Sequence, residues 1–236
     1  MAQMSIRVGG IYQTVKNIYV RVSGVYKSVN SGWVRVGGVW QQFYTSVVAP
    51  IDHNYSTANT YTETIPAGFT TLTIEAWGPT GLGAHGNTSG VGTQGGGGGS
   101  GGYSRSSYNI SLNTGQTFTV VIPAGASGTA TSVVNNSFTT SVNMTAPCGS
   151  NGAVGGASLG GAGGAAGAQG TGGTQATSPG NAGDYGDPNG GHPPADGLGG
   201  AAVVGIYATG PAGATGTYSN TVNNPGIAGV VNFHYS

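Results

Sequence analysis

Acidic, amide and histidine side chains gather in one short stretch in the last third of the chain. Asp184, Asp187, Asn189, His192 and Asp196 all fall within it. Carboxylate and amide oxygens are the ligands that Ca²⁺ prefers, and the first three of these residues could supply them. Their spacing matches no known calcium loop. We therefore interpret the stretch as a solvated polar loop and expect no metal site.

The remaining polar residues do not suggest catalysis. The chain has only six carboxylates and four histidines, and outside that stretch they are scattered. Nothing in their order indicates a Ser-His-Asp arrangement. Short GxGxxG matches occur inside the glycine runs, but they follow from composition and lack the strand, turn and helix that such a motif needs. We expect no enzymatic activity and no cofactor.

A binding surface is a better use for these side chains, because rigid scaffolds present function on their connecting loops. Tyrosine adds contact area there at a low cost in conformational entropy. The alternative is that each tyrosine packs on the glycine segments, or that each loop is a mere turn. The candidate receptor-binding residues are His85, Asn87, Asp184, Tyr185, Asp187, His192, Tyr207 and Tyr218.

The N-terminal residues repeat with a period of 14, as residues 6–12, 20–26 and 34–40 show. In each copy a Gly-Gly or Ser-Gly pair separates short β-branched runs, which predicts a two-residue β-hairpin. One hairpin buries little alone. Three equivalent hairpins suit one subunit that caps a trimeric fibre, whereas a small three-hairpin domain without matching symmetry is the plainer alternative. The candidate attachment residues are Arg7, Tyr12, Arg21, Tyr26, Arg35 and Trp40.

Charge divides the chain into two parts. The first 47 residues hold five basic side chains and no acid, whereas the remainder holds one arginine and six carboxylates. The two parts therefore have different partners. Nucleic acid is a weak candidate partner for the basic part, because five positive charges without a lysine cluster form too small a basic surface for phosphate contacts. We expect no nucleic-acid partner.

Glycine falls on every third residue between Gly149 and Gly173, and Ser158 is the one exception in that frame. A period of three is neither helical nor strand-like. It is the period of the extended polyproline II helix, in which an edge of glycines lets another backbone approach closely. Collagen would need a long unbroken repeat rich in proline, and a flexible linker has no reason to keep the frame. We therefore predict packed polyglycine II-type segments.

Alternating apolar residues predict strands elsewhere, within 61–77, 108–112, 118–122 and 133–144, and at the C-terminus. The fold class is therefore all-β, with an N-terminal triple β-hairpin repeat followed by a glycine-rich β-sandwich with packed glycine segments. We predict an attachment domain over 1–47, a linker over 48–60 and the glycine-rich β domain over 61–236. We see no signal peptide, and no apolar run is long enough to span a membrane, so we expect no membrane insertion. The single cysteine, Cys148, excludes an intrachain disulfide.

The chain resembles glycine-rich tail proteins of bacteriophages. The resemblance lies in the repeat at 34–40, in the five-glycine run 95–99 with the strand and hairpin after it, and in the ending 226–231. Thr114 stands where that family has the proline of its hairpin. The three-residue frame is also similar to the tail-fibre-tip adhesins of T-even-type phages. Those proteins attach through a small N-terminal domain and bind the host receptor with distal loops.

The resemblance implies a virion protein assembled in the host cytoplasm, with other virion proteins, including a trimeric tail fibre, and a bacterial surface receptor as partners. The receptor is a protein or a glycan. One rival is a purely structural virion component, such as a tail-tip, fibre or capsid decoration protein. A second rival is an ice-binding bundle with flat Thr and Ala faces, against which the basic repeat argues.

Overall fold

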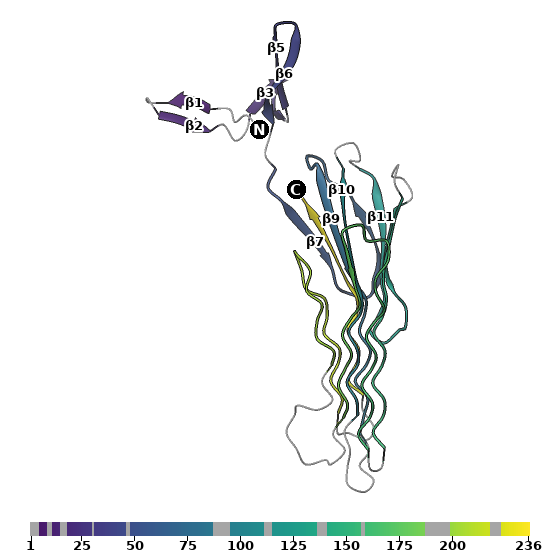
Figure 1. Cartoon of the computed structure of the whole chain (residues 1–236). Coiled ribbons are helices and arrows are strands. Elements are labelled where there is room, and N and C mark those ends of the chain that lie inside the picture. Colours follow the sequence, from purple (N-terminus) through teal and green to yellow (C-terminus); the bar gives the residue numbers. More distant parts are fainter. Residues whose placement is uncertain are drawn as a thin grey trace. The chain divides into compact units, whose positions relative to one another are not determined.

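The computed structural model places the chain in two units, Met1–Ala49 and Pro50–Ser236, each described here by itself (Figure 1). All regular structure in the described residues is β, with fifteen strands and no helix. The predicted all-β class is thus confirmed. The structure describes residues 5–8, 11–14, 18–29, 31–45, 48–86, 95–110, 115–135, 141–156, 159–186, 199–217 and 223–236.

The first unit consists of three separate antiparallel hairpins, one for each copy of the repeat. In the second and third hairpins the turn residues have positive φ, with 51° and 86° at Ser23 and Gly24 and 58° and 83° at Gly37 and Gly38. Primed two-residue turns need these angles, and glycine adopts them without strain. The hairpins are β1 (Ser5–Val8) with β2 (Ile11–Thr14), β3 (Ile18–Val22) with β4 (Val25–Val29), and β5 (Ser31–Val36) with β6 (Val39–Thr45).

The second unit contains a β-sandwich of two antiparallel sheets. The five-stranded sheet has the order β14-β10-β9-β15-β7 and the four-stranded sheet the order β13-β12-β11-β8. The C-terminal strand β15 lies between β9 and β7, so the end of the chain is built into the sheet. The strands are β7 (Ile51–Tyr55), β8 (Asn59–Thr64), β9 (Thr71–Trp77), β10 (Tyr103–Asn109), β11 (Thr117–Ile122), β12 (Thr131–Asn135), β13 (Val142–Ala146), β14 (Ala176–Ser178) and β15 (Val230–Tyr235).

The core lies between the two sheets, because alternate residues of each strand point inward. Ile74 of β9 and Phe233 of β15 face Phe118 and Val120 of β11, and all four are fully buried. The rings of Phe118 and Phe233 meet at 5.4 Å between centroids. These are the strands that the alternating pattern predicts. The sandwich is therefore the rigid base from which the rest of the unit extends.

The stretch 48–60, predicted to be a linker, instead contributes to the sandwich. It contains all of β7 and the first residues of β8. Ile51, His53 and Tyr55 alternate with the more exposed Asp52 and Asn54, which is the period of a strand with one buried face. The alternation is difficult to recognise in the sequence, because it is only five residues long and strongly polar.

Below the sandwich, the strands continue into a bundle of extended glycine-rich segments (Figure 1). We call it the glycine bundle. Its segments form no long β-ladders and are joined by single backbone hydrogen bonds that recur at every third residue. The polyglycine II conformation of each segment stays a prediction. The segments are 78–86, 95–102, 147–156, 159–170, 179–186, 199–203, 209–217 and 223–229.

Segment 95–102 is the centre of the bundle. Its N–H groups donate in rotation to three neighbouring segments, and its carbonyl oxygens accept from three others. Six segments therefore surround it, and no position along it is free to carry a large side chain. The donors are Gly95 and Gly98 toward 209–217, Gly96, Gly99 and Gly102 toward 147–156, and Gly97 and Ser100 toward 179–186.

This arrangement explains the run of five consecutive glycines at 95–99. A Cβ on Gly96 would overlap the carbonyl oxygen of Ala162, and one on Gly98 would overlap that of Gly81. Ser100 is the one side chain that fits, because its Oγ accepts the N–H of Asn181 at 2.8 Å. A segment enclosed on all sides needs glycine at nearly every residue, whereas the outer segment 159–170 also has room for exposed alanines such as Ala162 and Ala165.

The glycine frame from Gly149 to Gly173 belongs to two of those outer segments. Gly156 N donates to Leu159 O between the end of the first segment and the start of the second, and the exception Ser158 lies outside the described residues. In the second segment burial itself has a period of three: Gly161, Gly164 and Gly167 are buried, while the alanine that follows each of them is exposed.

Candidate functional site

The far end of the glycine bundle is where the chain repeatedly leaves and re-enters it. Segments 78–86, 147–156, 179–186 and 209–217 end at this end, away from the sandwich, and the central segment 95–102 begins there (Figure 1). Backbone hydrogen bonds join the segments at this level, such as Gly155 N to His85 O at 3.1 Å and Gly186 N to Gly161 O at 2.8 Å. We call this the distal end.

Three of the predicted receptor-binding residues lie at the distal end: His85, Asp184 and Tyr185. The backbone of His85 is fixed on both sides, since its N–H donates to Asn223 Oδ1 at 2.8 Å and its carbonyl accepts from Gly155. Asp184 accepts the N–H of Gly97 through its own carbonyl, and the Tyr185 side chain is exposed.

These three residues do not form one compact site. Segment 78–86 carries His85 and segment 179–186 carries Asp184, and both are bonded to the central segment 95–102 through different groups. The first donates to its carbonyl oxygens and the second accepts from its N–H groups, so they lie on different sides of it. Four further predicted residues, Asn87, Asp187, His192 and Tyr218, lie outside the described residues.

Tyr207, by contrast, is not at the distal end. It belongs to a tight turn that connects segments 199–203 and 209–217 at the sandwich end of the bundle, over the outer face of the five-stranded sheet. Gly205 N donates to Ala208 O and Gly210 N to Val203 O, both at 2.9 Å. The sequence predicted a loop here but could not say at which end of the molecule it lies.

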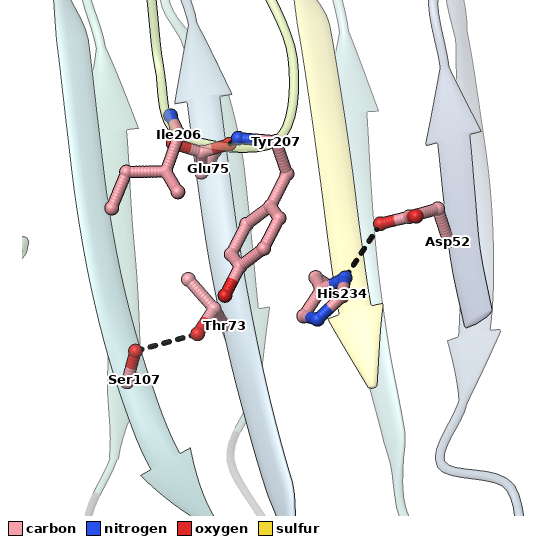
Figure 2. A network of polar contacts seen from close by, with 7 residues as sticks. All are labelled: Asp52, Thr73, Glu75, Ser107, Ile206, Tyr207 and His234. Carbon is pink, nitrogen blue, oxygen red and sulfur yellow. Dashed lines mark hydrogen bonds and ion pairs between the residues drawn. The ribbon is translucent and has the colours of Figure 1, made fainter. Parts of the chain in front are cut away.

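A buried carboxylate fixes this turn to the sheet (Figure 2). Glu75 of β9 is fully buried; its Oε1 accepts the N–H of Ile206 at 2.7 Å and its Oε2 that of Tyr207 at 2.9 Å. The Tyr103 hydroxyl donates to Oε1 as well, at 2.6 Å. Trp77 Nε1 donates to Val203 O at 2.8 Å. A carboxylate that accepts several hydrogen bonds is stable when buried, and here it orders a loop backbone.

The fixed turn places the Tyr207 ring flat on the imidazole of His234, with centroids 3.7 Å apart and planes 9° apart (Figure 2). His234 Nδ1 lies 2.9 Å from Asp52 Oδ1 on the neighbouring strand β7. On the other side Thr73 Oγ1 lies 2.7 Å from Ser107 Oγ. Tyr207 remains 44% exposed. Tyr207, His234, Asp52, Thr73 and Ser107 thus form a polar surface with one exposed tyrosine ring. This surface is separate from the distal end.

A second buried carboxylate, Glu63, joins the two sheets. It accepts the hydroxyl of Tyr235 at 2.6 Å and that of Tyr55, and its Oε1 lies 2.9 Å from His53 Nδ1. Burial and the adjacent carboxylate both raise the pKa of Tyr55 and Tyr235 well above the usual value of a tyrosine. For the same reasons the pKa of Tyr103 beside Glu75 is raised. These hydrogen-bond networks around Glu63 and Glu75 stabilise the second unit.

The predicted attachment residues share one face of each hairpin. Arg21 lies directly across from Tyr26, and Arg35 directly across from Trp40. All four side chains are exposed. In the first hairpin Arg7 lies across from Tyr12 in the same register, and only the backbone of these two residues is described. The structure therefore repeats the same pair of residues at the same position of each hairpin.

Sequence reasoning missed the residues that position Tyr207, namely Glu75, Trp77, His234 and Asp52. A carboxylate on an alternating strand looks solvent-exposed in the sequence, and only the loop that covers β9 makes it buried.

Within the described ranges no group of three or more His, Cys, Asp or Glu side chains could hold a metal ion. The same ranges contain no helix long and apolar enough to cross a bilayer. Neither a protein-family model nor a curated protein matches the chain.

Proposed function

We propose that the chain is a bacteriophage tail or tail-fibre protein that recognises the host cell surface, attached to the virion by its N-terminal hairpins. Recognition takes place at the distal end, through the stretches that connect the bundle segments. The observation that carries this proposal is the bundle itself: four of its eight hydrogen-bonded segments, 78–86, 147–156, 179–186 and 209–217, end together at the end away from the sandwich.

The bundle segments and the stretches that connect them have different proposed roles, because they carry different side chains. The central segments present almost no side chains, so they hold the reversals in place and contact nothing else. The connecting stretches carry the residues that can recognise a partner, including Asn87, Asp187, His192 and Tyr218 together with the exposed ring of Tyr185. Each contact is weak, and several copies on one virion strengthen the attachment by avidity.

Attachment to the virion is the proposed role of the first unit. Three hairpins with the same Arg and aromatic pair offer three equivalent contacts, which suits a trimeric fibre end. Their apolar side chains are exposed within the unit and need a partner to cover them.

The test separates recognition from stability. Residues 187–198 are replaced by a Gly-Ser sequence of equal length, and the purified chain is tested for binding to host cells and for blocking phage adsorption. We expect both activities to be lost while the melting temperature stays unchanged, because the bundle segments on either side are kept. A matched control replaces Ser127 and Thr129 in the exposed turn at the sandwich end.

If the unaltered chain neither binds host cells nor blocks adsorption, recognition is ruled out. The purely structural virion role is then supported, provided that the chain is found in purified particles. If the chain inhibits ice recrystallisation instead, the flat outer faces of the bundle are the functional surface.

A further inference from the structure

The two faces of each N-terminal hairpin differ sharply in chemistry. Because side chains alternate along a strand, the pairs Val22–Val25 and Val36–Val39 lie on one mainly aliphatic face, whose register positions also include Lys27 and Gln41. The opposite face carries Arg21 with Tyr26 and Arg35 with Trp40. On this second face, Tyr19 and Trp33 add one more exposed ring to each hairpin.

The arginine on that face has the same fixed geometry in both hairpins whose side chains are described. Arg21 Nε donates to Gly24 O of its own turn at 3.3 Å, and Arg35 Nε donates to Gly38 O at 3.2 Å. The Arg21 guanidinium carbon lies 5.7 Å from the centroid of the Tyr26 ring. The turn carbonyl thus holds each guanidinium close to the hairpin through its Nε–H, which leaves the two Nη groups for another partner.

These guanidinium groups have no counter-ion in their own unit. The first 47 residues contain no acid, so the unit cannot neutralise its five cations by itself. Among the residues that the structure describes, no side chain accepts a hydrogen bond from the Nη atoms of Arg21 or Arg35. A pre-ordered planar fork without a partner is suited to a carboxylate, which it binds through two parallel hydrogen bonds.

We propose that each hairpin binds one aspartate or glutamate side chain of the protein to which the chain attaches, end-on through both Nη groups of its arginine. The aromatic ring across the hairpin borders this pair and shields it from water. Arg7 has the same register position in the first hairpin, across from Tyr12. The partner surface is therefore acidic, with apolar side chains around each carboxylate.

A protein fits this surface better than a nucleic acid does. Val25 and Val39 are 60% and 63% exposed on the aliphatic face, and Tyr26 and Trp40 are 70% and 63% exposed on the other. A partner must cover these apolar side chains as well as the charges, whereas interfaces with DNA are more polar and depend mainly on phosphate contacts. This inference rests on the proposed virion attachment, which it makes specific.

The first experiment needs no knowledge of the partner. The full chain, labelled with ¹⁵N, is titrated with a hexaglutamate peptide, and the arginine Nε–Hε signals are followed by NMR. We expect the signals of Arg21 and Arg35 to shift while that of Arg105 does not. The double variant R21K/R35K keeps every charge but loses the fork, so we expect its affinity for the peptide to fall at least tenfold.

Three results of this titration overturn the proposal. The first is absence of any shift at Arg21 and Arg35, and the second is equal affinity of R21K/R35K for the peptide, which would indicate unspecific charge. The third is tighter binding to a short DNA duplex through the same arginines, which would favour a nucleic acid. The amide spectrum of R21K/R35K checks that the variant folds, which we expect because both side chains are exposed.

The second experiment distinguishes this inference from the proposed attachment. Phage particles assembled without the chain are incubated with it, either untreated, after amidation of their carboxyl groups, or after acetylation of their lysines as a control. We expect binding to be lost only after amidation, and R21K/R35K to bind at least tenfold more weakly. Binding that survives amidation keeps the attachment but overturns the carboxylate pairs. Absence of binding to untreated particles rejects the attachment, and the peptide titration then decides on the carboxylate sites.

Discussion

Two buried carboxylates stabilise the second unit through hydrogen bonds to residues distant in sequence. Glu63 connects the two sheets through tyrosine hydroxyls, and Glu75 orders the turn that carries Tyr207. Both lie on strands whose sequence alternates, so the pattern placed them in strands correctly. Their burial followed from partners distant in sequence, such as Tyr235 and Ile206, which no local pattern indicates.

Replacing Glu75 by glutamine tests the turn. The amide can accept fewer hydrogen bonds than the carboxylate and turns an N–H₂ group toward groups that themselves donate. We expect a loss of about 2–3 kcal/mol in the free energy of unfolding, measured by chemical denaturation. Asp52→Asn is the control, because Asp52 is half-exposed and its pairing with His234 contributes about 1 kcal/mol or less. Equal losses in the two variants would contradict the buried role of Glu75.

The tyrosines beside these carboxylates predict how stability depends on pH. The pKa values of Tyr55, Tyr103 and Tyr235 are higher in the folded chain than in the unfolded one. Their contribution is therefore complete below about pH 10, the ordinary pKa of tyrosine, and is lost as the pH rises from there toward the folded pKa values.

We expect the absorbance of tyrosinate to appear in two stages during an alkaline titration. Tyr55, Tyr103 and Tyr235 ionise in the later stage, together with unfolding, which circular dichroism reports. Tyr55→Phe is the matched variant, in which one of the late ionisations disappears. Smooth ionisation of all tyrosines near pH 10 in the folded chain would contradict the buried networks.

At the scale of the elements, the number of neighbours around a segment decides how often glycine must recur. The enclosed segment 95–102 has glycine at seven of its eight positions, whereas the outer segment 159–170 keeps glycine where it meets a neighbouring backbone and has alanine at exposed positions such as Ala162 and Ala165. The sequence thus predicted packed glycine segments and their reversals. It did not predict that the uninterrupted run, rather than the regular frame, lies at the centre.

Two neighbouring residues of an outer segment offer a direct test of this packing. Gly161 is buried, and a Cβ there would overlap the Ala153 carbonyl and the Gly96 N–H, both of them backbone groups that cannot move aside easily. Ala162 is the next residue, and it is exposed. We expect Gly161→Val to cost about 3 kcal/mol and Ala162→Val to cost little, as thermal unfolding would show. Equal melting temperatures would mean that the frame is not packed.

At the scale of the whole molecule, the two units differ in how they are stabilised. The second unit has a sandwich core and a hydrogen-bonded bundle, whereas the first consists of three two-stranded sheets with exposed apolar residues on both faces. Isolated two-stranded hairpins are marginally stable in water. Contacts within the unit therefore stabilise the hairpins of the first unit far less than they stabilise the second unit.

Separate expression of the two units tests this difference. We expect residues 50–236 to keep the melting temperature of the full chain to within a few degrees, because the sandwich lies wholly within them. Residues 1–49 alone should give no cooperative unfolding transition by circular dichroism. A cooperative transition of residues 1–49 as a monomer would mean that the hairpins do share a core of their own.

The sequence by itself determined what repeats locally: the hairpins with their turn glycines, the alternating strands and the three-residue glycine frame. Each of these follows from backbone geometry within a few residues. The tertiary structure decided what depends on distant neighbours. It showed that 48–60 joins the sandwich, that 95–102 is enclosed by six segments, and that Tyr207 lies on the sheet rather than at the distal end. Which end of the bundle a loop occupies depends on the order in which the segments pack, and that order is set by backbone hydrogen bonds that leave no mark on a single stretch of sequence.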